Sequence, residues 1–323
     1  MKKSKSDWQP LEFDNMQTVS LLDRPSKVGV ADFARPWEPG GSLQQFMATL
    51  PGILAADLFK QVVDAIATAV RRERVVLLGM GAHPIKVGLN PVLINAMERG
   101  IITGLALNGA GVIHDVELAL AGKTSEDVAA HLEQGQFGAA RETAEFIHGA
   151  AKGAYAESRV GLGRAVGRRL LQEAAPYAGI SLLAAAAKLE VPVTVHVALG
   201  TDIIHMHPAM DGAVMGALSY LDFKLFCRLV ANLEAGVYIN LGSAVILPEV
   251  FLKAVSVAIN MGYSLSGITT INMDFQRHYR TQLNVLDRPA AGRGVGINLI
   301  GHHEIMFPLL MAAIIDRLSE SHA

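Results

Sequence analysis

Short apolar runs that end in glycine or asparagine recur along this chain, with helical segments between them. The first run, Arg74–Leu78, reads RVVLL and is followed by Gly79. Strands buried on both faces read as continuous apolar runs, and parallel strands need long crossover connections. The pattern therefore predicts an α/β fold with a Rossmann-like, mainly parallel sheet and helices on both faces. The predicted strands are Arg74–Leu78, Ile102–Leu107, Val191–Leu199, Gly236–Leu241, Gly267–Met273 and Gly294–Leu299.

Helical patterns fill the intervals between these strands. Ser42 and Ser181 are expected to cap the helices that follow them, because a serine side chain accepts hydrogen bonds from free amides of a first turn. Another helix is expected to begin after Asn108. The remaining predicted helices are Ala55–Arg72, Asn90–Arg99, a helical stretch over Ser125–Glu173, Leu218–Leu233, Glu249–Gly262 and Phe307–Leu318.

The N-terminal residues have the composition of an extended arm. Residues 1–41 contain four prolines and end in Gly40-Gly41. Proline removes a backbone donor and disfavours helix in the residue before it. Beyond this stretch no segment rich in glycine, serine or proline divides the chain. We therefore expect an arm at 1–41 followed by one α/β domain at 42–323.

Composition gives no reason to expect nucleic acid or a membrane as a partner, and it favours a reducing compartment. The net charge of −2 gives no electrostatic reason to expect nucleic acid or an anionic membrane. The longest uncharged stretch, residues 254–273, contains too many polar residues for a membrane span. The single cysteine, Cys227, lies in an apolar run and is expected to be buried there rather than to act as a nucleophile. A chain with one cysteine forms no internal disulfide, which fits a reducing cytoplasm.

Histidines gather where the predicted strands end. In a parallel sheet, ligands bind outside the carboxyl ends of the strands, and six of the 11 histidines fall in these segments. Imidazole is the commonest metal ligand and carries protons near neutral pH. We expect a zinc-like divalent metal held by histidines, with nearby carboxylates as catalytic bases or supporting partners. The candidate ligands are His83, His114, His205, His207 and His302, and the candidate catalytic carboxylates are Asp115, Asp202 and Glu304.

Two of these histidine pairs leave alternatives open. His205 and His207 would point the same way on a strand and could reach one ion, whereas on a loop each would bond to the backbone. His302 and His303 are neighbours, so one is expected at the site and the other behind it or at a subunit interface. For any single histidine, an ordinary structural role is the simpler interpretation.

Two glycine-containing turns suggest a cofactor site. Gly79-Met-Gly81 begins a dinucleotide-binding fingerprint, but the third glycine is absent, and Asn108 stands where an acidic residue should end the second strand. The turn from Asn108 to Gly111 could present free amides to an anion. NAD is therefore possible, with Gly79, Gly81, Asn108, Gly111 and Gly242 as the candidate cofactor-binding residues.

Taken in order, five segments resemble the deoxyhypusine synthase family. The first strand and its turn, Val75–Gly81, resemble that family's first strand, and Phe307-Pro-Leu-Leu310 resembles its closing helix. The match runs from about position 74 to 315. The three segments between are Leu105–Leu120 (LALNGAGVIHDVELAL), Val191–Leu199 with Thr201-Asp202, and Ile239–Val245 (INLGSAV).

The resemblance implies a Rossmann-like, NAD-dependent enzyme that forms a tetramer of tight dimers and transfers a butylamine group through a lysine imine. The family's lysine motif corresponds here to the segment from Asn284 to Pro289, and no lysine follows Lys253. Arginine cannot replace that lysine, because a guanidinium stays protonated and forms no imine. We therefore expect that this chain does not make deoxyhypusine. Arginines in and near this segment, Arg277, Arg280 and Arg288, could instead bind a carboxylate or phosphate of the substrate.

Three functions remain open at this point. The first is a metal-dependent enzyme that acts on a small polar substrate in the remodelled cleft. The second is an NAD-dependent transferase that modifies an amine or polyamine without a lysine imine. The third is a homo-oligomer that binds a small molecule without turning it over.

Overall fold

The computed structural model describes residues 8–157 and 160–319. Within these ranges, six strands form one sheet in the order β3-β2-β1-β4-β5-β6, and every neighbouring pair is parallel. The predicted parallel α/β fold is confirmed, as is each of its six strands. Their bounds are β1 Val76–Met80, β2 Gly104–Asn108, β3 Val193–His196, β4 Val237–Leu241, β5 Ile268–Asp274 and β6 Gly294–Ile300.

Alternation along the strands divides the apolar side chains between two cores. Leu78 pairs with Ile239 across β1 and β4, and both belong to the larger core. Their neighbours Leu77 and Tyr238 also pair, and both belong to the smaller core. Successive residues of a strand point to opposite faces, so each strand contributes to both cores. This explains why the strands read as unbroken apolar runs.

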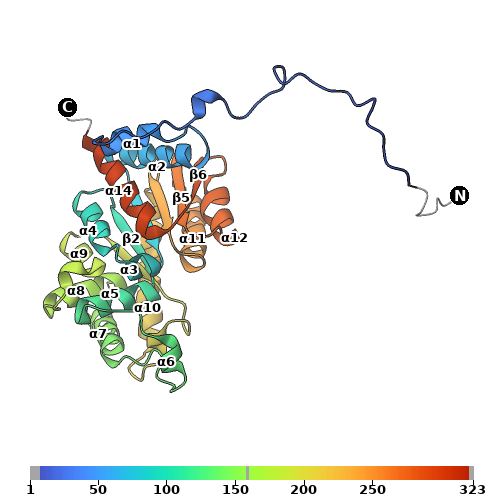
Figure 1. The fold of residues 1–323 in the computed structure, drawn as a ribbon. Helices are drawn as coiled ribbons and strands as arrows, with labels where there is room; N and C mark the ends of the chain where they lie inside the picture. The colour runs from blue at the N-terminus through green and yellow to red at the C-terminus, as the bar shows by residue number, and fades with distance from the viewer. Residues whose placement is uncertain (1–7, 158–159, 320–323) are drawn as a thin grey trace.

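Helices cover both faces of the sheet (Figure 1). Those whose buried residues belong to the larger core are α2 Leu54–Arg71, α4 Asn90–Glu98, α5 Gly109–Ala121, α7 Arg141–Glu157, α8 Leu162–Gln172, α9 Leu182–Lys188 and α14 His303–Ser319. The smaller core is covered by α11 Ile246–Asn260 and the π-helix η4 Gln282–Asp287, while α10 Gly212–Ala231 contributes to both. The short elements are α1 Leu43–Thr49, α3 His83–Lys86, α6 Val128–Leu132, α12 Tyr279–Thr281, α13 Arg288–Ala290, η1 Val30–Asp32, η2 Ala178–Ile180 and η3 Ile203–Met206.

The predicted helix caps are present. Ser42 accepts a hydrogen bond from the amide of Gln45, whose side chain in turn accepts one from the amide of Ser42. Ser181 caps α9, as predicted. Asn108, expected from the sequence in the turn before a helix, is found to cap α5 by accepting from the amide of Gly111. Each cap satisfies a donor that a first helical turn leaves free.

Three segments differ from the sequence prediction. The stretch 125–173 is divided into three helices, because Gly135 and Gly138 turn the chain with φ of 66° and 73° and Gly161 starts α8. Residues Ile203–Met206 form a 3₁₀ helix, so His205 and His207 do not lie on a strand. The last helix, α14, begins at His303 rather than at Phe307.

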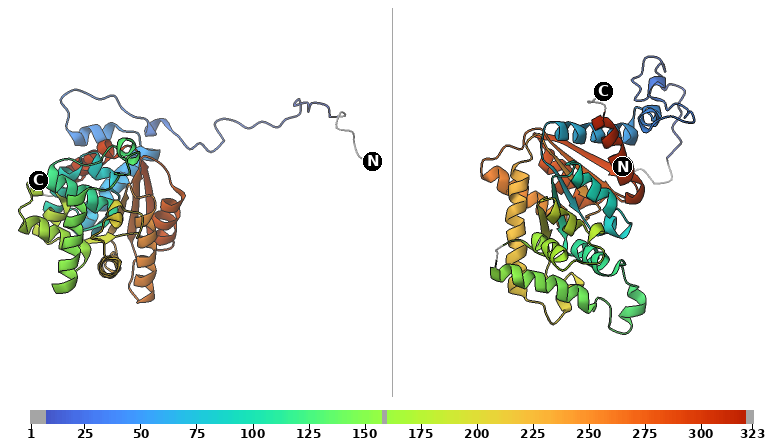
Figure 2. Two further views of the ribbon diagram at one scale, coloured as in Figure 1. Left: turned by 90° about the horizontal axis from the view of Figure 1, so that it is seen from below. Right: turned by 90° about the vertical axis from the view of Figure 1, so that its left-hand side faces the viewer.

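The described part of the N-terminal arm, residues 8–41, runs away from the helices and the sheet (Figures 1 and 2). Residues 1–7 of the predicted arm lie outside the described residues. Apart from η1, the arm contains no helix or strand in this range, and its side chains are exposed. Among the described residues, no helix has both the length and the hydrophobicity needed to cross a membrane.

Candidate functional site

The strand order reverses between β1 and β4, which are neighbours at the centre of the sheet. Connections leave these two strands toward opposite sides, and α/β proteins bind ligands outside the carboxyl ends of the strands at such a reversal. The loop after β1 leads into α3 at His83, and the loop after β4 begins at Gly242. Any site built by this fold is expected first at these residues.

Two histidines meet at the reversal point. The Nδ1 atom of His83 lies 2.8 Å from the Nδ1 atom of His303, the first residue of α14. The His303 side chain is completely buried, while that of His83 is partly exposed. Since one Nδ1 must donate and the other accept, the pair forms a hydrogen bond between two imidazoles from opposite ends of the chain.

The surroundings of His303 fix which ring donates. Its Nε2 lies 3.3 Å from the carbonyl oxygen of Met273 and 3.8 Å from Oδ1 of Asp274, and both oxygens are acceptors. Burial lowers the pKa of His303, Asp274 raises it and His83 lowers it again, so the net shift is downward and favours the neutral ring. A neutral His303 that carries its proton on Nε2 accepts at Nδ1. His83 therefore donates from Nδ1, and in the neutral form of this ring Nε2 carries a lone pair.

Aromatic and acidic residues of the β5 end complete this cluster. Asp274 is the last residue of β5, and its side chain is 4% exposed. Phe275 follows it, with its ring 5.3 Å from that of His83 and 5.7 Å from that of His303, centroid to centroid. His278 places its Nε2 3.8 Å from the other oxygen of Asp274. We refer to His83, His303, Asp274, Phe275 and His278 as the switch-point cluster.

Three glycines next to the switch-point cluster allow close packing of the backbone. A Cβ on Gly242, whose φ is 62°, would lie 2.6 Å from Cε1 of His303. A Cβ on Gly81 would lie 2.4 Å from the carbonyl oxygen of Gly242, and one on Gly79 would lie 2.4 Å from the hydroxyl of Tyr238. These three predicted cofactor-binding glycines therefore allow the two loops and β4 to approach each other.

NAD does not fit the turn after β1 in the manner of a dinucleotide fold. The space next to Gly81 is taken by the loop after β4, and α3, which would present amides to a pyrophosphate, is only 4 residues long. β2 ends at Asn108, where such sites carry an acidic residue for the ribose. The other two predicted cofactor residues, Asn108 and Gly111, bond to each other across the first turn of α5.

The predicted metal ligands do not converge. Among the described residues, no three His, Cys, Asp or Glu side chains form a group that could hold a metal ion. His83 and His303 meet, but Asp274 faces the opposite nitrogen of the His303 ring, so these three side chains do not point at one position. His302 points elsewhere, with its side chain 69% exposed and its ring stacked 6.4 Å from that of Phe275.

The remaining predicted ligands have separate partners. His114 bonds to the hydroxyl of Thr124, and His205 accepts at Nδ1 from the amides of Gly200 and Asp202. His207 accepts from the amide of Ala209, and its ring stacks on His148 with centroids 6.3 Å apart. The alternative interpretation of these histidines, as ordinary side chains bonded to neighbours close to them in the chain, is the one that the geometry supports.

Asp115, predicted as a catalytic carboxylate, lies in the protein interior. It is completely buried and accepts hydrogen bonds from the Ser181 hydroxyl and from the amides of Leu182 and Leu183, with a fourth from Asn90. Burial raises its pKa to about 6 against the opposing effect of these bonds. A carboxylate enclosed by four donors anchors the N-terminus of α9 to α5 and is not accessible to a substrate.

A small cavity brings together two of the other predicted residues. His114 and Asp202 both line a cavity of about 190 Å³ beside the first turn of α5. Asp202 packs against Gly109, where a Cβ would lie 2.0 Å from its Oδ2, and burial raises its pKa to about 6. Within the described residues Asp202 Oδ2 has no hydrogen-bond partner, and neither has Nε2 of His205, 4.0 Å away.

Glu304 and the three arginines do not assemble into a site. Glu304 is 45% exposed and lies 3.9 Å from His302. Arg277 donates to Gln282, Arg280 to Glu249, and Arg288 to Asn284. Asn284 also donates to Glu249, so these side chains tie the π-helix η4 to α11 instead of pointing into a common space.

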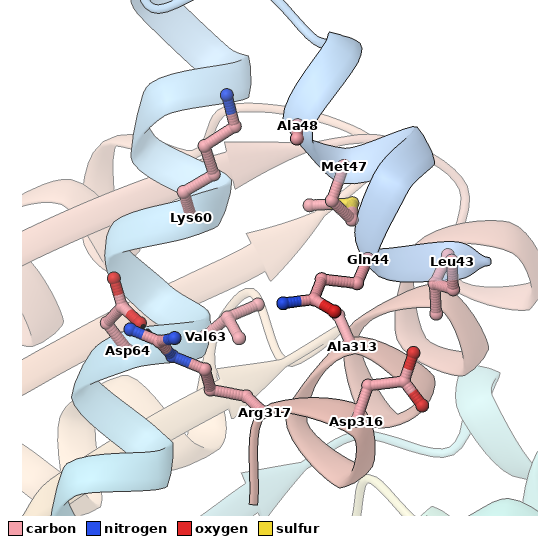
Figure 3. A pocket seen from close by; sticks show the side chains of 10 residues that line it. All are labelled: Leu43, Gln44, Met47, Ala48, Lys60, Val63, Asp64, Ala313, Asp316 and Arg317. Atoms are coloured by element: carbon pink, nitrogen blue, oxygen red, sulfur yellow. Dashed lines mark hydrogen bonds and ion pairs between the residues drawn. The ribbon is translucent and has the colours of Figure 1, made fainter. Parts of the chain in front are cut away.

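Another cavity, of about 260 Å³, lies between α1, α2 and α14 (Figure 3). It borders the last turns of α14, at Ala313 and Arg317. Because α14 starts at the carboxyl edge of the sheet with His303, this cavity lies toward the opposite edge. One side is closed by the ion pair of Arg317 and Asp64, whose Nε and Oδ1 atoms are 2.9 Å apart. Its position away from the strand ends makes it a weaker candidate for a catalytic site.

Sequence reasoning missed Asp274 and Phe275 and chose His302 in place of His303. A signal was present for Asp274, because an acidic residue directly after an apolar run stands at a strand end. No comparable signal distinguishes His303 from His302, because that choice depends on where α14 begins.

The fold is shared with solved structures at low sequence identity. A putative deoxyhypusine synthase from Entamoeba histolytica is 12% identical, with a TM-score of 0.50 over 88% of this chain and 96% of that one. The chain has a deoxyhypusine synthase-like fold. The AgrE protein in its ternary complex with ornithine and NAD+ is 13% identical, with a TM-score of 0.52 over 84% of this chain. This chain spans about a third of AgrE, 35% of its length.

No protein-family model matches the sequence, and no curated protein matches it. The resemblance drawn from five short segments therefore holds at the level of the fold.

Proposed function

We propose that this chain is an enzyme that acts on a small polar substrate by general acid–base catalysis, with His83 as the proton carrier. The observation that carries the proposal is the 2.8 Å contact between His83 and His303 at the reversal of strand order. A histidine whose one nitrogen is held by a buried partner and whose other nitrogen is free has the arrangement that a general base requires.

The buried residues His303 and Asp274 would stabilise His83 when it is protonated. When His83 Nε2 takes a proton from the substrate, the ring becomes an imidazolium that still donates from Nδ1 to His303. His303 is held in the accepting tautomer by Met273 O and by the carboxylate of Asp274. The charge on His83 is then balanced by Asp274 across one intervening imidazole, and the proton can return to a leaving group from the same atom.

Deoxyhypusine synthesis is not part of the proposal. The segment that aligns with the family's lysine motif forms η4, which contains no lysine. Its buried side chain Asn284 bonds to Glu249 and Arg288. No nucleophilic amine for an imine is present in this segment, so we route no covalent step through it.

An NAD-dependent reaction on an amine is the second candidate, and the strand order favours it, because dinucleotides bind sheets of this order at the same reversal point. The packing of Gly81 against Gly242 argues against the usual position for the pyrophosphate. A zinc-dependent reaction has less support, since the described histidines do not converge.

Activity-based metabolite profiling tests the proposal. Purified protein is incubated with a small-molecule extract, with and without NAD+, and depleted and newly formed compounds are identified by mass spectrometry. We expect turnover without added NAD+, its loss in His83→Gln and a strong reduction in His303→Gln. His131→Gln is the matched control, because the His131 side chain is 44% exposed and its ring bonds to Glu126, just before α6 and away from the switch-point cluster. Turnover that persists in His83→Gln contradicts the proposal. Turnover that needs NAD+ favours the second candidate. Stable binding of a compound without turnover favours a ligand-binding homo-oligomer.

A further inference from the structure

The N-terminal arm carries large apolar side chains that its own chain does not cover. Every described residue from 8 to 41 is exposed except Asp32, which is partly exposed. Leu11 and Phe13 are 78% and 70% exposed, and Trp8 and Met16 are similarly open. Scattered apolar residues on a surface need no explanation, but these four large apolar side chains lie within nine residues, and such exposed apolar clusters are typical of interaction sites.

The segment from Trp8 to Met16 has a two-sided pattern. In an extended chain, Leu11 and Phe13 point to one side, and Glu12 and Asp14 point to the other. These two carboxylates are the only charged groups between Trp8 and Met16. The segment therefore presents an apolar edge and an acidic edge, and its partner should offer an apolar floor beside a basic rim.

One groove of the described chain has these properties. It lies between α10 and α11 and has a volume of about 370 Å³. The apolar residues Phe223, Cys227 and Ala258 are among those that line it, and its charged lining residues are Lys224 and Arg228. Among the described residues, no aspartate or glutamate lines the groove. We refer to it as the α10–α11 groove.

The rim of the groove is held in place by aromatic contacts. Lys224 Nζ lies 4.9 Å from the ring centroid of Tyr220, and Arg228 Cζ lies 5.7 Å from that of Tyr263. Arg228 also donates to the hydroxyl of Tyr263 over 2.8 Å. Both cations are thus placed at the edge of the groove and both are exposed, so they can pair with carboxylates.

The lengths of the segment and the groove match. The lining residues on α10 run from Tyr220 to Ala231, which at 1.5 Å per residue is about 17 Å. An extended chain rises about 3.3 Å per residue, so about five residues of the arm fill this length. The stretch from Gln9 to Phe13 is sufficient, and it precedes the turn at Asp14-Asn15 in which the amide of Met16 donates to the carbonyl of Phe13.

We propose that the segment Trp8–Met16 of one copy of this chain docks in the α10–α11 groove of a second copy, with Leu11 and Phe13 on the groove floor and Glu12 and Asp14 against Lys224 and Arg228. In this structure the groove of the same chain is not covered by the arm, whose residues 8–41 are exposed apart from the partly exposed Asp32, so we assign the groove of a second copy to the arm. The arm joins α1, which packs on α14 at the face of the larger core, while the groove borders helices of the smaller core. From that start the arm runs outward, away from α10 and α11 (Figures 1 and 2).

Cysteine cross-linking between two copies tests the docking directly. Cys227 lines the groove and is the single cysteine of the chain. One copy carries Gln9→Cys together with Cys227→Ser, and it is co-expressed with a wild-type copy. Gln9 shares the side of Leu11 and Phe13 in an extended chain. A short bismaleimide can join positions 9 and 227 only between copies, and we expect this cross-linked peptide in the mass spectrum.

Two matched variants test the apolar and the charged contacts. Adding Phe13→Asp to the arm copy should lower the yield of the cross-link several-fold, whereas adding Gln17→Asp should leave it unchanged. Reversing the rim with Lys224→Glu and Arg228→Glu in the groove copy should also lower the yield. Glu12→Lys and Asp14→Lys in the arm copy should then restore it, because the pairing is re-formed with opposite signs.

Three results overturn the proposal. The first is the absence of a link between positions 9 and 227 in the co-expressed pair. The second is a link that forms only when Gln9→Cys and Cys227 are in the same chain, which would make the arm dock on its own groove. The third is a link whose yield does not respond to Phe13→Asp or to the reversal and restoration of charge. Apart from the partly buried Cys227, whose change to serine keeps nearly the same size, these residues are exposed, so the variants should fold as the wild type does, which circular dichroism checks.

Discussion

The Nδ1 atoms of His83 and His303 lie 2.8 Å apart, although 220 positions separate the two residues in the chain. His83 follows β1 and His303 begins the helix after β6, so only the completed sheet brings them together. The contact joins a partly exposed ring to a completely buried one. It therefore connects solvent at the switch point to the protein interior.

Nuclear magnetic resonance of the imidazole nitrogens should show His303 as a neutral ring with its proton on Nε2 at pH 7. Burial lowers the pKa of this ring, and His83 lowers it further. In His83→Asn the electrostatic effect of His83 is removed, and the pKa of His303 should rise toward its ordinary value. Nitrogen-15 shifts followed over a pH series measure both effects. A protonated His303 at pH 7 in the wild type would contradict this assignment.

Gly242→Ala should destabilise the protein and disturb His303. The residue has a φ of 62°, and its Cβ would lie 2.6 Å from the His303 ring. Gly100→Ala is the control, because Gly100 has a φ of 67° with nothing within 4 Å of the added Cβ. The control should lose about 1–2 kcal/mol of unfolding free energy from backbone strain alone. Gly242→Ala should lose about 1–3 kcal/mol more from the steric overlap. Equal losses in urea denaturation would show that His303 moves aside freely.

The sheet and most of its helices could be predicted because their signals are local. Strands buried on both faces are apolar throughout, and Ser42 and Ser181 are placed where helix caps belong. The order of the strands has no such local signal. It is set by the crossover that places β4 beside β1. The strand order in turn determines where it reverses, and therefore where the candidate site lies.

The candidate site was harder to predict from the sequence than the fold, because its geometry depends on which way single side chains point. His302 and His303 are adjacent, and the start of α14 at His303 turns one ring inward and leaves the other in solvent. Asp115 and His114 are also adjacent, but the docking of α9 buries Asp115 beneath Ser181. Histidines are concentrated near the strand ends. Each ring, however, is held by partners close to it in the chain, so the histidines do not converge on one site.

Asp115→Ala should be the most destabilising single substitution among the predicted site residues. It removes the acceptor of the Ser181 hydroxyl and of two amides in the first turn of α9, all of them buried. Buried donors left without acceptors cost about 1–3 kcal/mol each, so we expect a loss of about 3–5 kcal/mol. Asp127→Ala is the control, since Asp127 caps the exposed helix α6 and its loss should cost about 1 kcal/mol. Urea denaturation compares the two, and similar losses would contradict an anchoring role for Asp115.

The buried strand residue His196 should make the protein less stable in acid. Burial lowers its pKa from 6.5 to about 4, so the folded state holds the ring neutral where the unfolded chain is protonated. Stability from this group is therefore present above pH 6.5 and falls between pH 6.5 and 4, by a total of about 3 kcal/mol. In His196→Gln this part of the pH dependence should vanish. Denaturation midpoints at pH 7.5 and pH 5 measure it, and an unchanged slope in the variant would contradict the assignment.

Asp202→Asn should make the protein more stable at neutral pH, the opposite of what most substitutions at a buried residue do. Burial raises the pKa of Asp202 from 3.8 to about 6, and its Oδ2 has no hydrogen-bond partner among the described residues. Because the folded-state pKa is above the unfolded value, ionisation opposes folding. The penalty is complete above pH 6 and disappears as the pH falls toward 3.8. Asparagine has nearly the same shape and carries no charge, so at pH 8 the variant should gain on the order of 2 kcal/mol.

The comparison of two pH values separates this effect from a packing change. At pH 8 the gain of Asp202→Asn should be largest, and near pH 4 wild type and variant should have nearly equal unfolding free energies, since both side chains are then neutral in the folded state. Asp23→Asn, in the exposed arm, controls for the loss of one negative charge and should change stability little at either pH. A stable gain at both pH values would indicate better packing against Gly109. A loss at pH 8 would instead mean that the ionised carboxylate has a partner in solution, and the most direct source is a cation held in the cavity that Asp202 lines with His114.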